Sequence, residues 1–417
     1  VIFNKSLSLI FLLYIKSFLY VSVPLLLFFF LCSLVSLRNF IKYRKTLNSE
    51  LPKNVADYKP KFALYFSAPR GSEFHIAMWI KYIEKLNGKF IIILREAFNY
   101  ESISAMTRSP VIVCKTMSTL DQCIPESLTT IFYVNNGSKN THMVRFNHLT
   151  HVQLLHGDSD KAPSFNPVTA MYDKILVAGQ LGVDRYKKNG VFIPLDKFEI
   201  VGRPQLEKIK QISNQKKGPI TTVLYAPTWL GYNADSAYSS ILKSEAIVRG
   251  LLERDNTRVV IKLHPYLYKN KETNIIADNL REILERENEK GILNHIFIDK
   301  LDVNIDLYDC FNMCDALISD VSSVVSDFLF SEKPICVTDM KNEKDNMSVT
   351  FPISTVSYVL DSNMSNLANV IDELTIHDTK RVERTNFKEY VLGNFPNESY
   401  SDVFTNTANK IINKSQV

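Results

Sequence analysis

The chain has 417 residues, enough for two domains of ordinary size, and its 46% hydrophobic and 22% charged residues exclude a wholly disordered protein. Only 13 residues are glycine, which excludes collagen-like and glycine-linker architectures, and neither the G-x-G-x-x-G nor the G-x-x-x-x-G-K-[ST] pattern occurs. The net charge of +5 is concentrated in residues 1–62, with nine basic and two acidic side chains, and this placement argues against a nucleic-acid partner.

The N-terminal region predicts a membrane anchor. Residues 17–37 form a run of 21 residues without a charge, long enough to span a bilayer, and a shorter apolar run precedes it. Basic side chains come after the run at Arg38, Lys42, Arg44 and Lys45. The positive-inside rule therefore predicts an anchor at 1–37, a basic connector at 38–60, and a cytoplasmic catalytic part that faces the membrane surface.

Short apolar segments alternate with helical stretches after residue 60. Strands are predicted at 62–67, 90–94, 111–114, 130–134, 152–155, 174–177 and 199–201, with helices at 73–86 and 180–189. Each strand is rich in β-branched or aromatic residues and is bounded by polar or turn residues. We expect these segments to form a first domain at 61–207.

A stretch rich in Lys, Gln and Asn at 208–218 interrupts this pattern and predicts a hinge. The alternation resumes with strands at 221–226, 259–263, 295–298, 316–318 and 335–338, and helices at 238–253, 274–289, 305–313 and 323–330. This pattern predicts an α/β fold with two Rossmann-like domains facing a cleft. The second domain is expected at 219–380 and a C-terminal helical segment at 381–417.

No metal site is expected from the sequence. His148, His151 and His156 would not share one face of a strand. Cys310 and Cys314 could share a helical face, but a zinc site would need two more ligands nearby. The six cysteines form no dense framework, which suits a reducing compartment.

Polar residues come after the predicted strands at five places, where ligands bind in open α/β sheets. The first is LLHGDSDK at 154–161. His156 directly follows an apolar strand and can take a proton from a hydroxyl near neutral pH, and Gly157 allows a tight turn. Taken alone, His156 is better explained as a histidine that caps a strand or bonds to a nearby carbonyl.

Two further places carry an arginine and a hydroxyl. Arg203, in the GRP sequence after a strand, has the geometry to bind a phosphate with two hydrogen bonds, unless it lies in solvent. Thr228, in YAPTW, can donate to a phosphate or a ribose, and Trp229 can wall a pocket or lie in the core.

The last two places repeat this logic. Lys262 and His264, in KLHP, point to the same side by strand alternation and can neutralise a diphosphate. Ser322 and Ser323 begin a predicted helix, where free N–H groups favour a phosphate, and Asp327 lies one turn further on. A simple serine cap is the alternative for this helix.

These segments in this order resemble the CDP-glycerol glycerophosphotransferase family of teichoic-acid primases and polymerases. The resemblance covers roughly residues 150–340 and rests on HG-x-x-x-K, GRP, YAPTW, KLHP and SD-x-SS-x-x-x-D. It implies the GT-B fold, with an acceptor-side first domain, a CDP-donor second domain and no cofactor. It also implies transfer of a polyol phosphate from a CDP-polyol donor to a glycan or lipid-linked acceptor, with release of CMP.

The resemblance also implies roles for individual residues. His156 matches the general base, and the donor-contacting positions are Arg203, Pro227, Thr228, His264, Ser322, Ser323 and Asp327. We expect His264 to be the second catalytic residue, and Gly157, Lys161 and Lys262 to contact the substrate as well.

The sequence departs from the family pattern at the cleft. The family often has HGTPLK where this chain has acids at Asp158 and Asp160, and arginines are replaced by Gln205 and Leu230. These changes lower the expected positive charge and leave the polyol and the acceptor open. Two alternatives stay open: a GT-B glycosyltransferase that uses a nucleotide sugar, and a non-catalytic membrane scaffold that binds a nucleotide or glycan.

Overall fold

The computed structural model describes residues 2–212, 218–231, 237–299, 302, 305–343 and 346–415. The chain divides into two units. The first unit consists of Val1–Pro60 and Cys114–Leu128, and the second consists of Lys61–Val113 and Thr129–Val417. Part of the predicted hinge, 213–217, lies outside the described residues.

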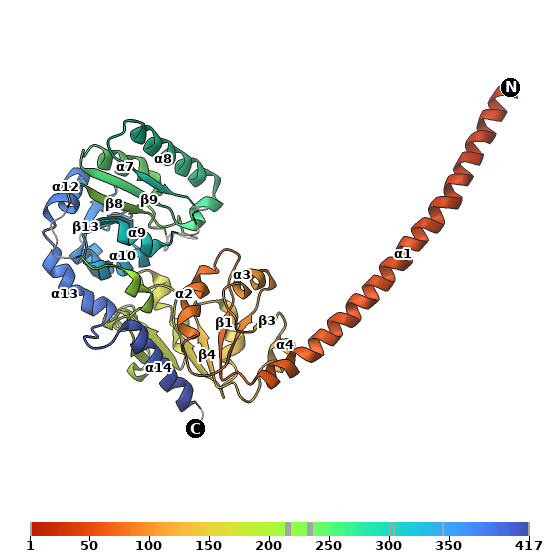
Figure 1. The fold of residues 1–417 in the computed structure, drawn as a ribbon, viewed down its shortest axis with the longest axis horizontal. Coiled ribbons are helices and arrows are strands. Elements are labelled where there is room, and N and C mark those ends of the chain that lie inside the picture. The colour runs from red at the N-terminus through yellow and green to blue at the C-terminus, as the bar shows by residue number, and fades with distance from the viewer. Residues whose placement is uncertain are drawn as a thin grey trace. The chain divides into compact units, whose positions relative to one another are not determined.

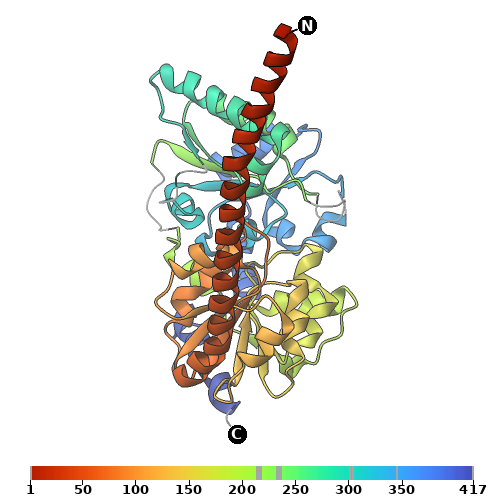
Figure 2. The ribbon, with the colours of Figure 1, turned by 90° about the vertical axis from the view of Figure 1, so that its right-hand side faces the viewer.

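Helix α1, Ile2–Tyr58, is the main element of the first unit (Figures 1 and 2). Its 57 residues include the predicted anchor and continue through the predicted connector. Ser22–Asn39 is long and apolar enough to cross a membrane, and none of this stretch is buried within the protein. The unit also contains helix α4, Met117–Gln122, in which the Thr116 hydroxyl accepts from the Thr119 amide at 3.0 Å.

The first sheet of the second unit has seven parallel strands in the order β3-β2-β1-β4-β5-β6-β7. Their bounds are β1 Phe62–Phe66, β2 Phe90–Leu94, β3 Val111–Val113, β4 Thr130–Tyr133, β5 Thr150–Gln153, β6 Lys174–Val177 and β7 Phe198–Ile200. The central strands β1, β2 and β4 are fully buried, as is typical of a parallel sheet covered on both faces.

The second sheet has six parallel strands in the order β10-β9-β8-β11-β12-β13. Their bounds are β8 Thr221–Ala226, β9 Thr257–Lys262, β10 Ile296–Ile298, β11 Ala316–Asp320, β12 Ile335–Asp339 and β13 Tyr358–Asp361. In each sheet the first strand lies centrally, the next two strands lie on one side of it, and the later strands lie on the other side. This strand order is that of Rossmann folds. The two-sheet α/β fold is therefore confirmed.

Helices cover both faces of the second sheet. Along β8, Leu224 packs in one apolar cluster and Tyr225 in another, because alternate strand residues point to opposite faces. The helices are α7 Ser244–Leu252 and α8 Lys271–Glu289 on the Tyr225 side, and α9 Leu307–Met313 and α10 Ser323–Phe328 on the Leu224 side.

The two C-terminal helices join different cores. Helix α13, Arg381–Leu392, packs against α6, Gln180–Lys188, and places Val391 in the core of the second sheet. Helix α14, Tyr400–Lys414, returns to the first sheet, where Phe404 packs in the same cluster as Trp79 of helix α2, Phe74–Ile83. The chain therefore crosses back to its first sheet at its end (Figure 1).

Several elements differ from the sequence prediction. Strand β5 ends at Gln153 rather than at 155, because Leu155 adopts a left-handed conformation with φ of 57°. Helix α7 begins at Ser244, six residues later than predicted. Strand β13 was missed, since its four residues form a short segment at the edge of the sheet.

The contact between α6 and α13 provides a test of the packing. A Cβ at Gly179, which precedes α6, would lie 2.6 Å from the backbone of Tyr390 and Val391, whereas a Cβ at Gly218 would meet nothing within 4 Å. We expect Gly179→Ala to lower the free energy of unfolding by ~1–3 kcal/mol, since the backbone of α13 must shift. Gly218→Ala is the control, and equal unfolding curves for both variants and the wild type would contradict this packing.

Candidate active site

The loop after β5 is held in a strained conformation. The Gln153 side chain accepts from the amides of Leu154 and Leu155 at 3.1 and 3.2 Å, and Trp79 Nε1 donates to the Leu155 carbonyl at 2.6 Å. A left-handed leucine costs on the order of 1–3 kcal/mol and persists only where its surroundings fix it. The loop thus presents His156 in a defined position.

The hydrogen bond of His156 determines which ring nitrogen is the base. His156 Nδ1 lies 3.1 Å from the Val134 carbonyl, which can only accept, so Nδ1 carries the proton and Nε2 keeps a free lone pair. Burial, together with the charge of Arg203, lowers the pKa of His156 to about 4. His156 is therefore a neutral base at physiological pH.

His264 has the opposite proton arrangement. It follows β9, and its Nδ1 accepts from the Tyr266 amide at 3.1 Å, so the neutral ring carries its proton on Nε2. Burial and the charges of Lys161 and Lys269 lower the pKa of His264 to about 4. His264 is thus a neutral hydrogen-bond donor.

Phe74 lies between the two histidines. Its ring centroid is 6.4 Å from that of His156 and 6.5 Å from that of His264, with nearly perpendicular planes in both cases. Residues from the two sheets therefore meet at this point. The sequence prediction did not include Phe74 or His75, because both lie at the start of α2 and not directly after a strand.

The His-Gly turn closely approaches the start of α10. A Cβ at Gly157 would lie 2.9 Å from Ser323 Oγ, so only glycine fits this contact without a shift. Ser322 Oγ is buried and has no hydrogen-bond partner among the described residues. The structure thus brings Gly157 next to Ser323, the residue that follows Ser322.

A second contact joins Lys161 to the second sheet. Lys161 Nζ donates to Thr228 Oγ1 at 3.3 Å, directly after the buried Pro227, and burial lowers the pKa of Lys161 to about 8. The Thr228 amide donates to the buried carboxylate of Asp320 at 2.7 Å, which also accepts from the Thr338 hydroxyl at 2.6 Å. Asp320, whose role the sequence did not reveal, fixes the Thr228 loop.

Arg203 and Asp327 form a buried ion pair. Arg203 Nε lies 2.8 Å from Asp327 Oδ1, and Nη2 donates to Oδ2 at 3.1 Å. The Tyr308 hydroxyl donates to the same carboxylate at 3.3 Å. The two residues predicted to contact the donor therefore contact each other here, and Asp327 fixes the plane of the guanidinium.

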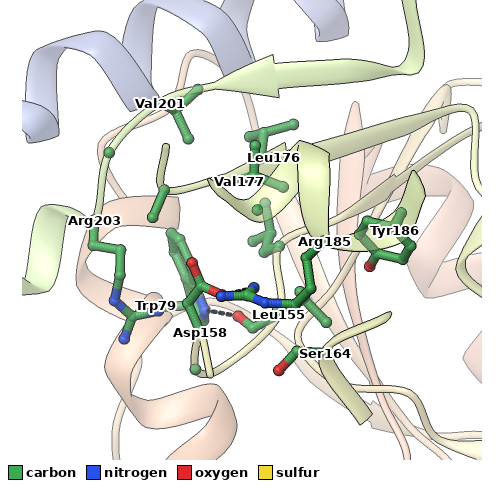
Figure 3. Close-up of a pocket in the computed structure, with 15 residues that line it drawn as sticks. Trp79, Leu155, Asp158, Ser164, Leu176, Val177, Arg185, Tyr186, Val201 and Arg203 are labelled. Carbon is green, nitrogen blue, oxygen red and sulfur yellow. Dashed lines mark hydrogen bonds and ion pairs between the residues drawn. The ribbon is translucent and has the colours of Figure 1, made fainter. Parts of the chain in front are cut away.

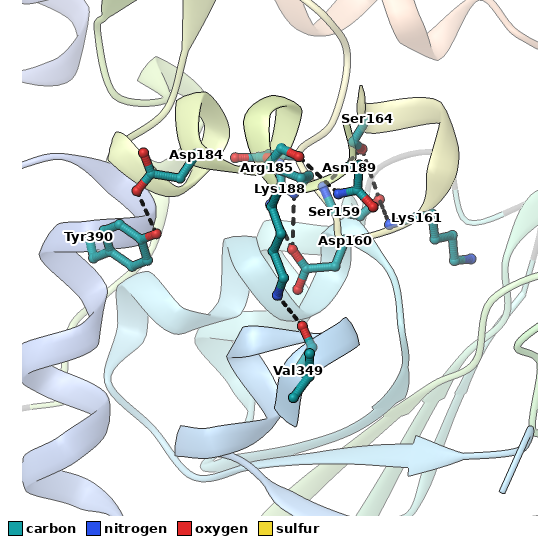
Figure 4. Close-up of polar contacts among 11 residues, drawn as sticks. Ser159, Asp160, Lys161, Ser164, Asp184, Arg185, Lys188, Asn189, Val349 and Tyr390 are labelled. Carbon is teal, nitrogen blue, oxygen red and sulfur yellow. Dashed lines mark hydrogen bonds and ion pairs between the residues drawn. The ribbon is translucent and has the colours of Figure 1, made fainter. Parts of the chain in front are cut away.

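The two unusual acids of the first motif are buried. Asp158 and Asp160 both pair with Arg185 of α6. The Asp160 carboxylate accepts from Arg185 with N–O distances of 3.0 and 2.9 Å (Figure 4). The expected loss of positive charge is therefore smaller than the sequence suggested, because Arg185 offsets one of the two acids. Figure 3 shows Arg185 and Asp158 beside Trp79 and Arg203, around a cavity of about 20 Å³, room for one water molecule.

Lys262 contacts the main chain of the second sheet's half of the protein. Its ammonium donates to the Ile305 carbonyl at 3.0 Å, in the segment before α9. None of its described hydrogen bonds joins it to His264 or to the serines of α10. Eight of the other predicted residues lie close to one another: His156 and His264 flank Phe74, and the pairs are Gly157–Ser323, Lys161–Thr228 and Arg203–Asp327. For all of these residues, as for Lys262, contact with substrate stays a prediction.

Solved structures show the same two-sheet fold. The wall teichoic acid polymerase TagF is 15% identical with a TM-score of 0.54, and the alignment covers 92% of this chain and 97% of that one. A histidine-to-asparagine variant of TagF soaked with CDPG matches with the same TM-score. S. aureus MnaA, solved with UDP, is 12% identical with a TM-score of 0.55, covering 84% of this chain and 96% of that one.

No curated protein matches this chain in sequence. Residues 196–389, in contrast, match the family model of CDP-glycerol:poly(glycerophosphate) glycerophosphotransferase. The match contains four of the five motifs, and the His156 motif lies before it. The resemblance predicted from the motifs is thus confirmed, because residues 196–389 are similar to the CDP-glycerol:poly(glycerophosphate) glycerophosphotransferase family.

Proposed function

We propose that this protein transfers glycerol phosphate, or another polyol phosphate, from a CDP-activated donor to a hydroxyl of a cell-surface glycan or lipid-linked acceptor. The observation that carries the proposal is the pair His156 and His264, which flank Phe74 with opposite proton arrangements. One ring can accept a proton while the other donates a hydrogen bond. The family match over residues 196–389 supports the donor class.

In the proposed reaction, His156 Nε2 removes the proton of the acceptor hydroxyl. The acceptor oxygen then attacks the β-phosphorus of the donor, the bond from that phosphorus to the bridging oxygen breaks, and CMP leaves. His264 Nε2–H donates to the departing phosphate. Such a transfer depends chiefly on positioning and on neutralising charge, which fixed donors in a buried cleft supply.

We propose that the donor diphosphate binds where the two sheets meet. Lys161 and Thr228 already contact each other there, and Ser322 Oγ is a buried donor without a partner among the described residues. Asp327 occupies Nε and Nη2 of Arg203, so Nη1 is the edge we assign to a phosphate oxygen. Asp327 would then orient Arg203 for the donor. The predicted substrate contacts that complete this site are Gly157, Pro227, Lys262 and Ser323.

We further propose that α1 anchors the protein to the cell membrane with the catalytic unit in the cytoplasm. The stretch Ser22–Asn39 meets the length and hydropathy required of a spanning helix. The excess of Lys and Arg on its C-terminal side supports a cytoplasmic location for the catalytic unit.

The donor class can be tested directly with purified full-length protein. Release of CMP from CDP-glycerol or CDP-ribitol, with an acceptor lipid extract present, supports the proposal. Turnover of a UDP- or GDP-sugar instead would favour a glycosyltransferase, and turnover of no donor would favour a scaffold.

Replacing the base should remove catalysis and spare binding. We expect His156→Ala to lower kcat for CMP release by at least about 100-fold, because general base catalysis contributes 10²–10⁴-fold. The dissociation constant for CDP-glycerol, measured by calorimetry, should change by less than about threefold. The matched control is His148→Ala at an exposed histidine outside the site, and near-wild-type turnover in His156→Ala would refute the assignment.

The pKa shifts predict a displaced pH profile. Because His156 must be unprotonated and its pKa is lowered to about 4, kcat/KM should fall on acidification only near pH 4, not near pH 6.5. Because Lys161 must be charged and its pKa is lowered to about 8, kcat/KM should fall again as the pH rises through 8. Lys161→Arg should remove this alkaline limb, and an unchanged limb in that variant would show that Lys161 does not cause it.

The anchor can be tested by placing charge in the apolar stretch. Each arginine at the centre of a spanning helix costs ~2.5–3.5 kcal/mol on insertion scales. We expect Leu26→Arg combined with Phe29→Arg to move the protein out of the carbonate-resistant membrane fraction. Glu50→Arg, which adds charge outside the apolar stretch, should leave the protein in that fraction. Retention of the double variant would contradict the anchor.

A further inference from the structure

His75 has a close relation to the proposed base. It is the second residue of α2, and its ring lies parallel to that of His156, with centroids 3.6 Å apart and planes 16° apart. The edge of Phe74 also contacts His75, at 4.3 Å between centroids.

The hydrogen bonds of His75 indicate what its ring contributes. Its Nδ1 is buried and has no partner among the described residues, and the parallel arrangement prevents a hydrogen bond between the two imidazoles. His75 therefore contacts His156 through its ring face. A flat aromatic surface at this distance restricts rotation of the second ring about its Cβ–Cγ bond.

We propose that His75 is a positioning residue, whose ring holds His156 in the plane that directs Nε2 toward the acceptor hydroxyl. One hydrogen bond, from Nδ1 to the Val134 carbonyl, leaves the His156 ring free to tilt about that bond. The stacked face of His75 removes this freedom. This inference rests on the proposed function and deepens it, since it adds a residue outside the matched family region.

The charges around His75 suit this role. The charges of His156 and His264 act on His75. Arg203 acts on His156 from the loop after β7, while Lys161 and Lys269 act on His264. Burial and the two histidines hold the pKa of His75 well below its usual value, below that of His156. When His156 takes the acceptor proton, it therefore becomes an imidazolium against the face of a neutral ring, a favourable contact.

Three substitutions separate stacking from other roles. His75→Phe keeps a flat ring without nitrogens, His75→Leu fills a similar volume without a ring, and His75→Ala removes both. We expect His75→Phe to retain at least about a third of the wild-type kcat for CMP release. His75→Leu and His75→Ala should lose about tenfold or more in kcat, with KM for CDP-glycerol changed less than about threefold. Loss in His75→Phe equal to that in His75→Ala would show that the nitrogens matter and would overturn the proposal, as would full activity in His75→Leu.

A second measurement does not depend on turnover. In protein labelled with ¹³C-histidine, the ring-current shielding of the His156 Cε1–H signal, assigned with His156→Gln, reports the stack. This signal should move downfield in His75→Leu and stay shielded in His75→Phe. If the wild type releases no CMP but the shift is seen, the stack stands and the proposed function fails. If the wild type is active but the signal does not move, the positioning role fails. The unfolding midpoints of all variants identify any variant that misfolds.

Discussion

The close contact between the turn at Gly157 and the start of α10 is the constraint on which the site depends. A side chain at Gly157 would meet Ser323 Oγ at 2.9 Å, so the backbone of the first sheet's loop approaches the second sheet's helix as only glycine allows. Because His156 precedes this glycine, the same contact places the base beside the groups of the second sheet. Hydrogen bonds that the Gln153 side chain accepts and that Trp79 Nε1 donates also fix the loop.

Buried charge is used here for position more than for stability. Arg203 and Asp327 are almost fully buried, and so are Arg185 and its partner Asp160. Desolvation of such pairs offsets much of their attraction, so they contribute little net stability. Their fixed geometry instead keeps each buried arginine in one orientation before an anion binds. This preorganisation is how electrostatic catalysis avoids reorganising its dipoles during the reaction.

The sequence predicted the sheets well because alternating apolar segments determine them. Strands β2, β6 and β8 begin and end where the sequence pattern placed them. It also located most of the site, since the carboxyl ends of parallel strands converge by topology. It could not show that Leu155 would end β5 early, because that depends on Trp79 from another element. Nor could the sequence predict a place for His75 in the site, because the fold of α2 alone brings its ring against that of His156.

The return of α14 to the first sheet affects the order in which the chain can fold during synthesis. Phe404, Ala408, Ile411 and Ile412 belong to the same apolar cluster as Phe62 and Trp79 near the other end of the folded unit. During synthesis, domains generally fold as units from the N-terminus. The first sheet cannot complete its core in that order, because α14 is synthesised after the whole of the second sheet. An apolar surface of this half therefore stays exposed to solvent while the second sheet is synthesised. Removal of α14 would thus affect the half of the protein that is made first.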